Sequence, residues 1–156
     1  MGKFNGEWLD AAEALKKPDE KKTKIIEIAT ACTNVKIKIG STENIVKFLK
    51  KEIDGNNVFV SIEAMKAAAC LASGLKEHFG PCIKEIISSV LLKQKEKKQQ
   101  VVDAIKAVLD ASLNCSNLEE IKDDVFPKIN DKVQYVRAGT LKYVERLSIV
   151  TYIDVL

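Results

Sequence analysis

Short polar segments interrupt the apolar pattern of this chain at three places, and a similar stretch follows each of them. The polar segments are DGNN, KQKEKKQQ and NDKVQ, which begin at Asp54, Lys93 and Asn130. The stretches that follow are NVFVSIEAMKAAACL, QVVDAIKAVLDASL and YVRAGTLKYVERL, with apolar residues at three- and four-residue steps. This pattern constrains the chain to fold as a series of helices joined by polar turns.

The spacing of these segments predicts a repeat protein. From Asn57 to Gln100 is 43 residues and from Gln100 to Gln134 is 34, within the range of a two-helix repeat of the HEAT or armadillo kind. We therefore predict an all-α fold, an α-solenoid of about four HEAT-like antiparallel helix pairs in a single domain covering residues 1–156. The turns within the pairs would then share one edge, so that residues far apart in sequence form one surface. The pairs are expected at residues 4–33, 41–75, 80–115 and 117–148.

Proline and capping residues mark the expected helix boundaries. The first pair should divide at Lys17–Pro18, because proline is tolerated in a helix only near its first turn. The alternating segment VKIKIGS at 35–41 has no partner strand of similar type and is interpreted as a linker, with Ser41 capping the next helix. Residues 149–156 look like the start of a further repeat, so we expect a fragment truncated at its C-terminus.

The composition is that of an ordinary globular domain, with 46% apolar and 30% charged residues. No uninterrupted apolar run approaches the roughly 18 to 20 residues of a membrane span, and the N-terminus shows no signal-peptide pattern. We therefore expect a cytoplasmic protein that has no membrane partner. The four cysteines form no CxxC pair and are interpreted as reduced core residues. They are Cys32, Cys70, Cys82 and Cys115.

The sequence contains no motif of a catalytic or metal site. The GxxxxGK[ST] loop, the GxSxG elbow and the HExxH pair are all absent. His78 is the single histidine and is interpreted as an exposed residue at a helix end. We expect neither enzymatic activity nor a metal or other cofactor.

Basic residues gather in the last two polar turns. If the turns share an edge, these cations would attract an acidic partner; the alternative is that they are simply solvated loops, since the net charge is only +3. Nucleic acid is disfavoured, because the sequence shows no aromatic stacking set near the lysines and no known nucleic-acid-binding motif. The aromatic residues are interpreted instead as core or groove residues, namely Trp8, Phe48, Phe59, Phe79 and Tyr135.

Three long segments carry the most specific pattern in the chain. They are NIVKFLKKEIDGNNVFVSIEAMKAAACLASGLKEHFG, VLLKQKEKKQQVVDAIKAVLDASL and VFPKINDKVQYVRAGTLKYVERL, of which LASGLKEHFG and KEKKQQVVDAI are the most diagnostic parts. Together they closely resemble the TOG domain of the microtubule polymerase family, over nearly the whole chain. The resemblance implies a flat paddle of HEAT-like pairs whose turns contact the side of an αβ-tubulin heterodimer, at microtubules, the spindle or the centrosome. It also implies further repeats after the fourth.

The resemblance assigns candidate tubulin contacts to every turn. They are Lys17 and Pro18 in the first turn, Gly55, Asn56 and Asn57 in the second, Lys95, Lys97 and Lys98 in the third, and Lys132 and Arg137 in the fourth. The first turn departs from the family, which typically has a tryptophan where this chain has Pro18. Trp8 lies ten residues too early to replace it. Its spacing with Ala11, Ala12 and Leu15 favours the core, and a place on the edge is the alternative.

Two functions follow from these observations. The first is a non-enzymatic module that binds αβ-tubulin and acts in microtubule polymerisation or plus-end regulation, as a monomeric fragment of a larger multi-domain protein. The alternative is a HEAT-repeat scaffold that binds another protein through its helices or concave face, without affinity for tubulin.

Overall fold

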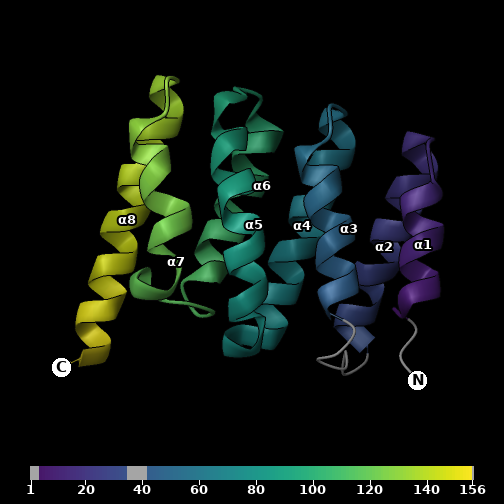
Figure 1. Ribbon diagram of the computed structural model, residues 1–156, viewed down its shortest axis with the longest axis horizontal. Coiled ribbons are helices and arrows are strands. Elements are labelled where there is room, and N and C mark those ends of the chain that lie inside the picture. Colours follow the sequence, from purple (N-terminus) through teal and green to yellow (C-terminus); the bar gives the residue numbers. More distant parts are fainter. Residues whose placement is uncertain (1–3, 35–41, 156) are drawn as a thin grey trace.

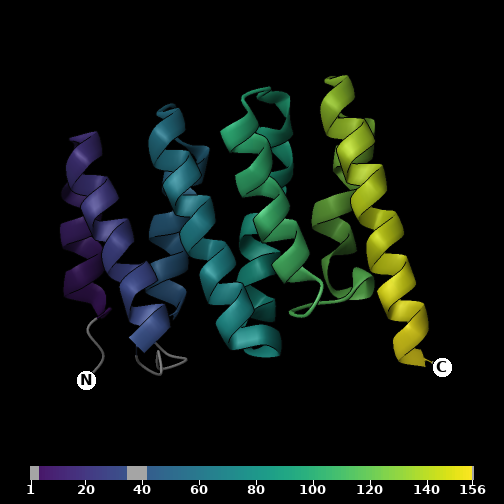
Figure 2. The same ribbon diagram turned by 180° about the vertical axis from the view of Figure 1, so that it is seen from behind.

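The chain folds into antiparallel helix pairs that stack side by side (Figures 1 and 2). The computed structural model describes residues 4–34 and 42–155, and this part of the chain contains no β-strand. The first helices of the pairs are α1 (Gly6–Ala14), α3 (Thr42–Asp54), α5 (Gly80–Leu92) and α7 (Leu118–Val125). The second helices are α2 (Pro18–Asn34), α4 (Val58–Leu75), α6 (Gln99–Ser112) and α8 (Gln134–Val155). The predicted all-α solenoid is confirmed.

Short 3-10 helices occupy three of the connections. The segment η2 (Lys76–Phe79) joins α4 to α5, whereas η3 (Lys93–Lys95) and η4 (Phe126–Asn130) lie in the turns within the third and fourth pairs. Capping asparagines set the starts of three helices, because the side chains of Asn5, Asn57 and Asn117 each accept a backbone N–H from the first turn that follows.

Two layers of helices bury the core. The first helices α1, α3, α5 and α7 contact one another in sequence, and α4 lies at the centre of the other layer, against α2 and α6. Small buried side chains such as Ala64, Ala68 and Ala72 allow these neighbours to approach α4 closely. The packing changes at the fourth pair, because α8 contacts η3, η4, α5 and α7 rather than packing along α6.

Trp8 belongs to the core, as its spacing predicted. The side chain is 7% exposed and makes edge-to-face contacts with Phe4 and Phe48, with ring centroids 5.1 and 5.5 Å apart. Its indole nitrogen donates a hydrogen bond of 3.3 Å to the Glu27 carboxylate. The alternative, in which a shifted first helix brings Trp8 to the edge, is wrong.

The most apolar part of the chain lies within the stack. The stretch Val58–Lys95 contains a window that is long and apolar enough to cross a membrane by length and composition alone. More than half of this window, 56%, is buried inside the protein, because α4 and α5 are central helices of the two layers. Buried core helices also meet this criterion of length and apolar composition, and they do so without entering a membrane.

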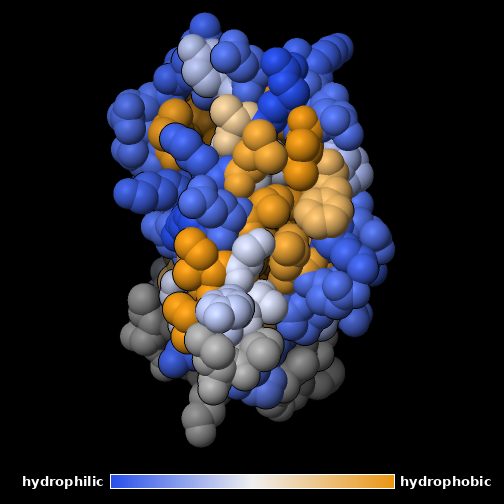
Figure 3. Space-filling model, turned by 90° about the vertical axis from the view of Figure 1, so that its left-hand side faces the viewer, coloured by the Kyte–Doolittle hydropathy of each residue, from blue (hydrophilic) through white to orange (hydrophobic). Residues whose placement is uncertain are grey.

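The C-terminal segment differs from its expected role as the start of a new repeat. Helix α8 continues without a break through residues 149–155, so this segment forms the last turns of α8. Several apolar side chains of α8 and η4 are exposed, including Leu141, Ile149, Ile153 and Phe126. Figure 3 shows an apolar patch on this end of the stack, which we call the end patch.

The remaining expectations concern individual residues. Cys82 and Cys115 are buried, Cys70 is partly buried, and all three are free thiols. His78 is exposed, as expected. The linker at 35–41, the Ser41 cap and the side chain of Cys32 lie outside the described residues.

Candidate functional site

The turns within the helix pairs lie along one edge of the molecule, at the top of Figure 1. They comprise residues 15–17, 55–57, 93–98 and 126–133, and we call this side the turn edge. The connections between successive pairs, including η2 and residues 113–117, lie at the opposite side. Asn56, Lys97 and Lys132 therefore belong to turns of the same edge, as the repeat pattern predicted.

The first turn offers no large side chain to a partner. The Lys17 carbonyl accepts the Lys21 N–H at 3.1 Å, and Pro18 is the first residue of α2, where a helix does not need its N–H. Both residues are exposed. The position that the resemblance assigns to a tryptophan is therefore a small and rigid proline surface.

The second turn divides its three candidates between two roles. The Asn57 side chain accepts the Val60 N–H at 3.1 Å and so caps α4. The Gly55 carbonyl accepts hydrogen bonds from Lys93 and Ser61. Asn56 is exposed, and its side chain makes no hydrogen bond within the described residues. Only Asn56 has a side chain that is free to contact a partner.

Lys93 ties the second turn to the third. Its ammonium donates a hydrogen bond of 3.0 Å to the Gly55 carbonyl of the preceding pair. Desolvation by partial burial, together with the nearby Lys95, lowers the pKa of Lys93. The sequence did not single out this residue from the other lysines of KQKEKKQQ, because composition does not show which lysine turns inward.

The third turn combines cations with exposed aromatic rings. Lys95, Lys97 and Lys98 are exposed. The Lys97 ammonium lies 5.1 Å from the centre of the Tyr135 ring, and the Lys98 ammonium lies 5.2 Å from that of Phe59. These distances are within the range of cation–π contacts.

The position of these rings corrects the sequence interpretation. Phe59 and Tyr135 are 55% and 56% exposed, so neither is a core residue. Tyr135 lines a groove between α6 and α8, which agrees with the expected core or groove position. Both rings lie beside third-turn lysines, where the sequence suggested no aromatic stacking set. Each is the second residue of its helix, α4 or α8. Helical spacing failed for Phe59 because the first turn of a helix at the edge extends beyond the neighbours that would bury it.

Internal hydrogen bonds stabilise the fourth turn. The Arg137 guanidinium donates a hydrogen bond of 2.8 Å to the Asp131 carbonyl, and the Asp131 carboxylate accepts the Val133 N–H at 2.9 Å. Lys132 lies between Asp131 and Val133 in the sequence and is exposed. Arg137 therefore shapes the turn, whereas Lys132 presents its charge to solvent.

The chemistry of the turn edge is that of a binding surface. In the described part of the chain, no three histidine, cysteine, aspartate or glutamate residues gather into a possible metal site. The edge instead presents ammonium groups, an amide and two aromatic rings on a rigid stack of helices. These features define the class of the protein as a HEAT-like α-solenoid with a basic edge suited to an acidic protein partner.

Comparison with known proteins identifies the family. No protein-family model matches the chain. The chain is 34% identical over 126 residues to Protein MOR1 of Arabidopsis thaliana and 33% identical over 113 residues to Protein mini spindles of Drosophila melanogaster. These matches cover 80% and 71% of the chain, but only 6% of either relative. The chain thus corresponds to a small part of these long proteins.

Solved structures agree in fold. The chain superposes with a TM-score of 0.81 and 28% identity on a structure from a study of microtubule plus-end tracking by XMAP215, CLIP-170 and EB1, covering 93% of this chain and 61% of that one. A structure from a study of TOG–tubulin binding specificity matches with a TM-score of 0.75 and 18% identity, over 94% of this chain and 58% of that one. The chain belongs to the TOG domains of the microtubule polymerase family.

Proposed function

We propose that this domain binds the αβ-tubulin heterodimer through its turn edge and acts, as part of a longer protein, in microtubule polymerisation or plus-end regulation. The observation that carries the proposal is that Asn56, the third-turn lysines and Lys132 share one edge of a TOG domain. Studies of structurally similar proteins concern tubulin recruitment by TOG domain arrays and TOG–tubulin binding.

We divide the candidate residues into proposed contacts and supports according to their exposure and hydrogen bonds. Asn56, Lys95, Lys97, Lys98 and Lys132 are exposed and act as the tubulin contacts. Gly55, Asn57 and Arg137 act through the shape of their turns, because their polar groups are already engaged within the protein. Lys17 and Pro18 contribute little, since a large aromatic anchor of the kind that dominates interfaces is missing there. We therefore expect modest affinity for tubulin.

The role is one of binding, without catalysis, at microtubules, the spindle or the centrosome. The names of two relatives support this location, since they are Centrosomal protein 224 of Dictyostelium discoideum and Spindle pole body component alp14 of Schizosaccharomyces pombe. We also infer that further helix pairs of the longer protein cover the end patch. The domain would then be monomeric, as one part of that longer protein.

Reversing the charge of the third turn tests the proposal. The variant with Lys95→Glu, Lys97→Glu and Lys98→Glu is expected to lose co-migration with free tubulin on size exclusion at low salt, because it places carboxylates where the edge meets an acidic surface. These side chains are exposed, so circular dichroism should show an unchanged helical fold. Undiminished co-migration of the folded variant would remove the basis of the proposal.

A matched control separates the edge from total charge. Lys47→Glu, Lys50→Glu and Lys66→Glu change the net charge by the same amount, at exposed positions on α3 and α4 rather than in a turn. This control is expected to co-migrate with tubulin like the unmodified domain. Equal loss in both variants would show a response to net charge alone.

A further inference from the structure

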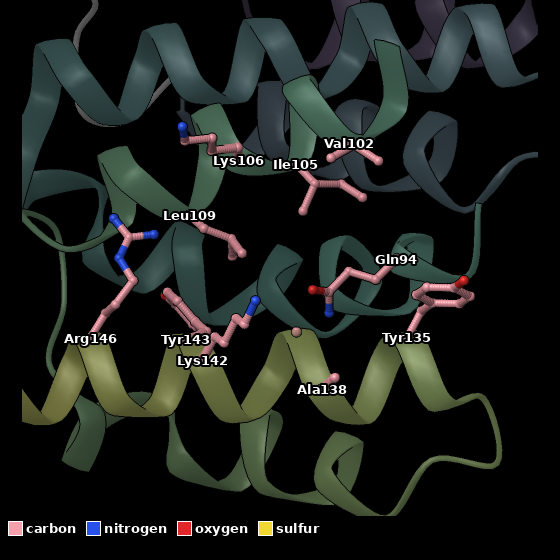
Figure 4. A pocket seen from close by; sticks show the side chains of 11 residues that line it. Gln94, Val102, Ile105, Lys106, Leu109, Tyr135, Ala138, Lys142, Tyr143 and Arg146 are labelled. Atoms are coloured by element: carbon pink, nitrogen blue, oxygen red, sulfur yellow. The ribbon is translucent and has the colours of Figure 1, made fainter. Parts of the chain in front are cut away.

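A groove separates α6 from α8 on the face of the second helices. It has a volume of about 550 Å³ and is lined by α6, α8 and Gln94 of η3 (Figure 4). Pockets that hold small molecules or peptide side chains typically enclose roughly 300 to 1,000 Å³. The groove extends along the helices away from the turn edge. It shares Gln94 and Tyr135 with that edge, but none of the proposed tubulin-contact residues lines it.

Side-chain contacts lie at both ends of the groove. At the end near the turn edge, the Gln94 side chain donates a hydrogen bond of 3.0 Å to the Leu91 carbonyl and lies directly against α8 at Gly139. A Cβ atom at Gly139 would overlap the Gln94 amide, so a larger residue there would require the flexible Gln94 side chain to move. At the other end, Arg146 of α8 forms an ion pair with Asp110 of α6. These contacts link η3 and α6 to α8 at the two ends of the groove.

The floor of the groove is apolar. Ile105, Leu109 and Tyr143 are 4%, 7% and 1% exposed. The Tyr143 hydroxyl is 2.6 Å from the Ser112 hydroxyl, so its polar atom is satisfied inside the protein. The rim is more exposed to solvent, since Val102 is 43% exposed. Such a surface favours apolar side chains of a ligand.

The sides of the groove are positively charged. Lys106 projects from α6 and Lys142 from α8, on opposite sides of the same hollow (Figure 4). Both are exposed, and neither forms an ion pair within the part of the chain that the structure describes. Arg146 is already neutralised by Asp110. The groove therefore carries two uncompensated cations above its apolar floor.

We propose that the α6–α8 groove binds a short acidic peptide segment of a partner protein, with apolar side chains over Leu109 and Tyr143 and carboxylates facing Lys106 and Lys142. The eleven helical steps from Tyr135 to Arg146 span roughly 16 Å at 1.5 Å per residue. This length suits about five residues of an extended peptide at 3.3 Å each, or about three turns of a helix. The site does not depend on tubulin binding.

Two synthetic peptide sets provide the probe. The first contains short peptides that combine Leu or Phe with Asp or Glu, and the second replaces the acidic residues by Lys or Arg. Fluorescence anisotropy at low salt is expected to detect binding of members of the acidic set only. Amide shifts in NMR spectra of the domain should then concentrate at residues 102–109 and 135–146. Equal binding of the basic set, binding by neither set, or shifts elsewhere would overturn the proposal.

Charge reversal in the groove gives the decisive comparison. Lys106→Glu with Lys142→Glu is expected to weaken the acidic peptide on the order of tenfold or more, because both carboxylates then meet like charges. Lys47→Glu with Lys50→Glu, on α3 of the opposite layer, is the matched control and should leave peptide affinity unchanged. Peptide affinity that survives the groove variant would contradict the assignment.

A cross-comparison separates this site from the turn edge. The variant with Lys95→Glu, Lys97→Glu and Lys98→Glu is expected to retain peptide affinity, and the groove variant is expected to retain co-migration with tubulin. Loss of peptide binding in the turn-edge variant would show that the peptides bind the edge and would overturn the groove. If the domain binds the acidic peptides but not tubulin, the proposed function is wrong and the proposal for the groove is supported.

Discussion

Tyr143 shows how strongly one residue depends on its surroundings. Its side chain is 1% exposed between α8 and the core, and its hydroxyl is paired with that of Ser112. Desolvation by burial raises the pKa of Tyr143 to about 12, while the hydrogen bond between Tyr143 and Ser112 counteracts part of this effect. The fold therefore holds this phenol in its neutral form well into the alkaline range.

This shift predicts a loss of stability at alkaline pH. The pKa of Tyr143 is higher in the folded state than the value near 10 expected when unfolded, so the unfolded chain releases the proton first as pH rises. The stabilising contribution is complete below pH 10 and is lost between about pH 10 and 12. A shift of two units corresponds to at most about 2 to 3 kcal/mol in the free energy of unfolding.

Urea unfolding of the Tyr143→Phe variant at neutral and alkaline pH measures this effect. The variant should be less stable at neutral pH by about 1 kcal/mol, because the buried Ser112 hydroxyl loses a partner. Its stability should then fall less steeply above pH 10 than that of the unmodified domain. Tyr152→Phe removes an exposed tyrosine and should keep the original pH dependence. If the free energy of unfolding falls with pH equally for Tyr143→Phe and the unmodified domain, the raised pKa of Tyr143 is refuted.

Residue-level prediction from the sequence succeeded for Trp8, in the first turn of α1. The spacing of Trp8 placed it in the core, and the structure agrees. The same reasoning failed for Phe59, which begins its helix at the turn edge, whereas Tyr135 lines the groove. Periodicity identifies the side of a helix that a residue occupies, but it does not tell how far along the helix the neighbours extend.

At the scale of elements, the order of helices was predictable and their mutual spacing was not. Polar turns, Pro18 and apolar periodicity located the helix pairs. At one end of the groove between α6 and α8, Gln94 lies against Gly139, a contact between η3 and α8 that no local pattern reports. The end of α8 was also missed, because polar and apolar residues continue there without a breaker that would separate a turn from a longer helix.

The start of α4 separates capping from binding within one turn. Asn57→Ala is expected to lower the free energy of unfolding by about 1 kcal/mol, because the cap on the Val60 N–H is lost, and Asn57→Asp should preserve it. Asn56→Ala should leave stability unchanged and weaken tubulin binding. Thermal unfolding and size exclusion with tubulin distinguish the two. A stability loss in Asn56→Ala as large as that in Asn57→Ala would show that the roles are assigned wrongly.

At the scale of the whole molecule, charge is distributed unevenly rather than in large excess. The net charge is only +3, from 25 basic and 22 acidic residues. The third turn nevertheless presents Lys95, Lys97 and Lys98 together on the turn edge. An acidic partner that approaches this edge meets a local field that the total charge does not reveal.

This uneven distribution predicts how the proposed tubulin binding depends on salt. Exposed charges are screened beyond about 10 Å at 0.1 M ionic strength, so affinity should decrease as salt is added. The neutral variant with Lys95→Gln, Lys97→Gln and Lys98→Gln should bind more weakly at low salt and show a flatter salt dependence. Lys47→Gln, Lys50→Gln and Lys66→Gln remove the same charge from α3 and α4 and should retain the original slope. If both variants flatten the curve equally, the attraction arises from net charge, and the turn edge is not where tubulin binds.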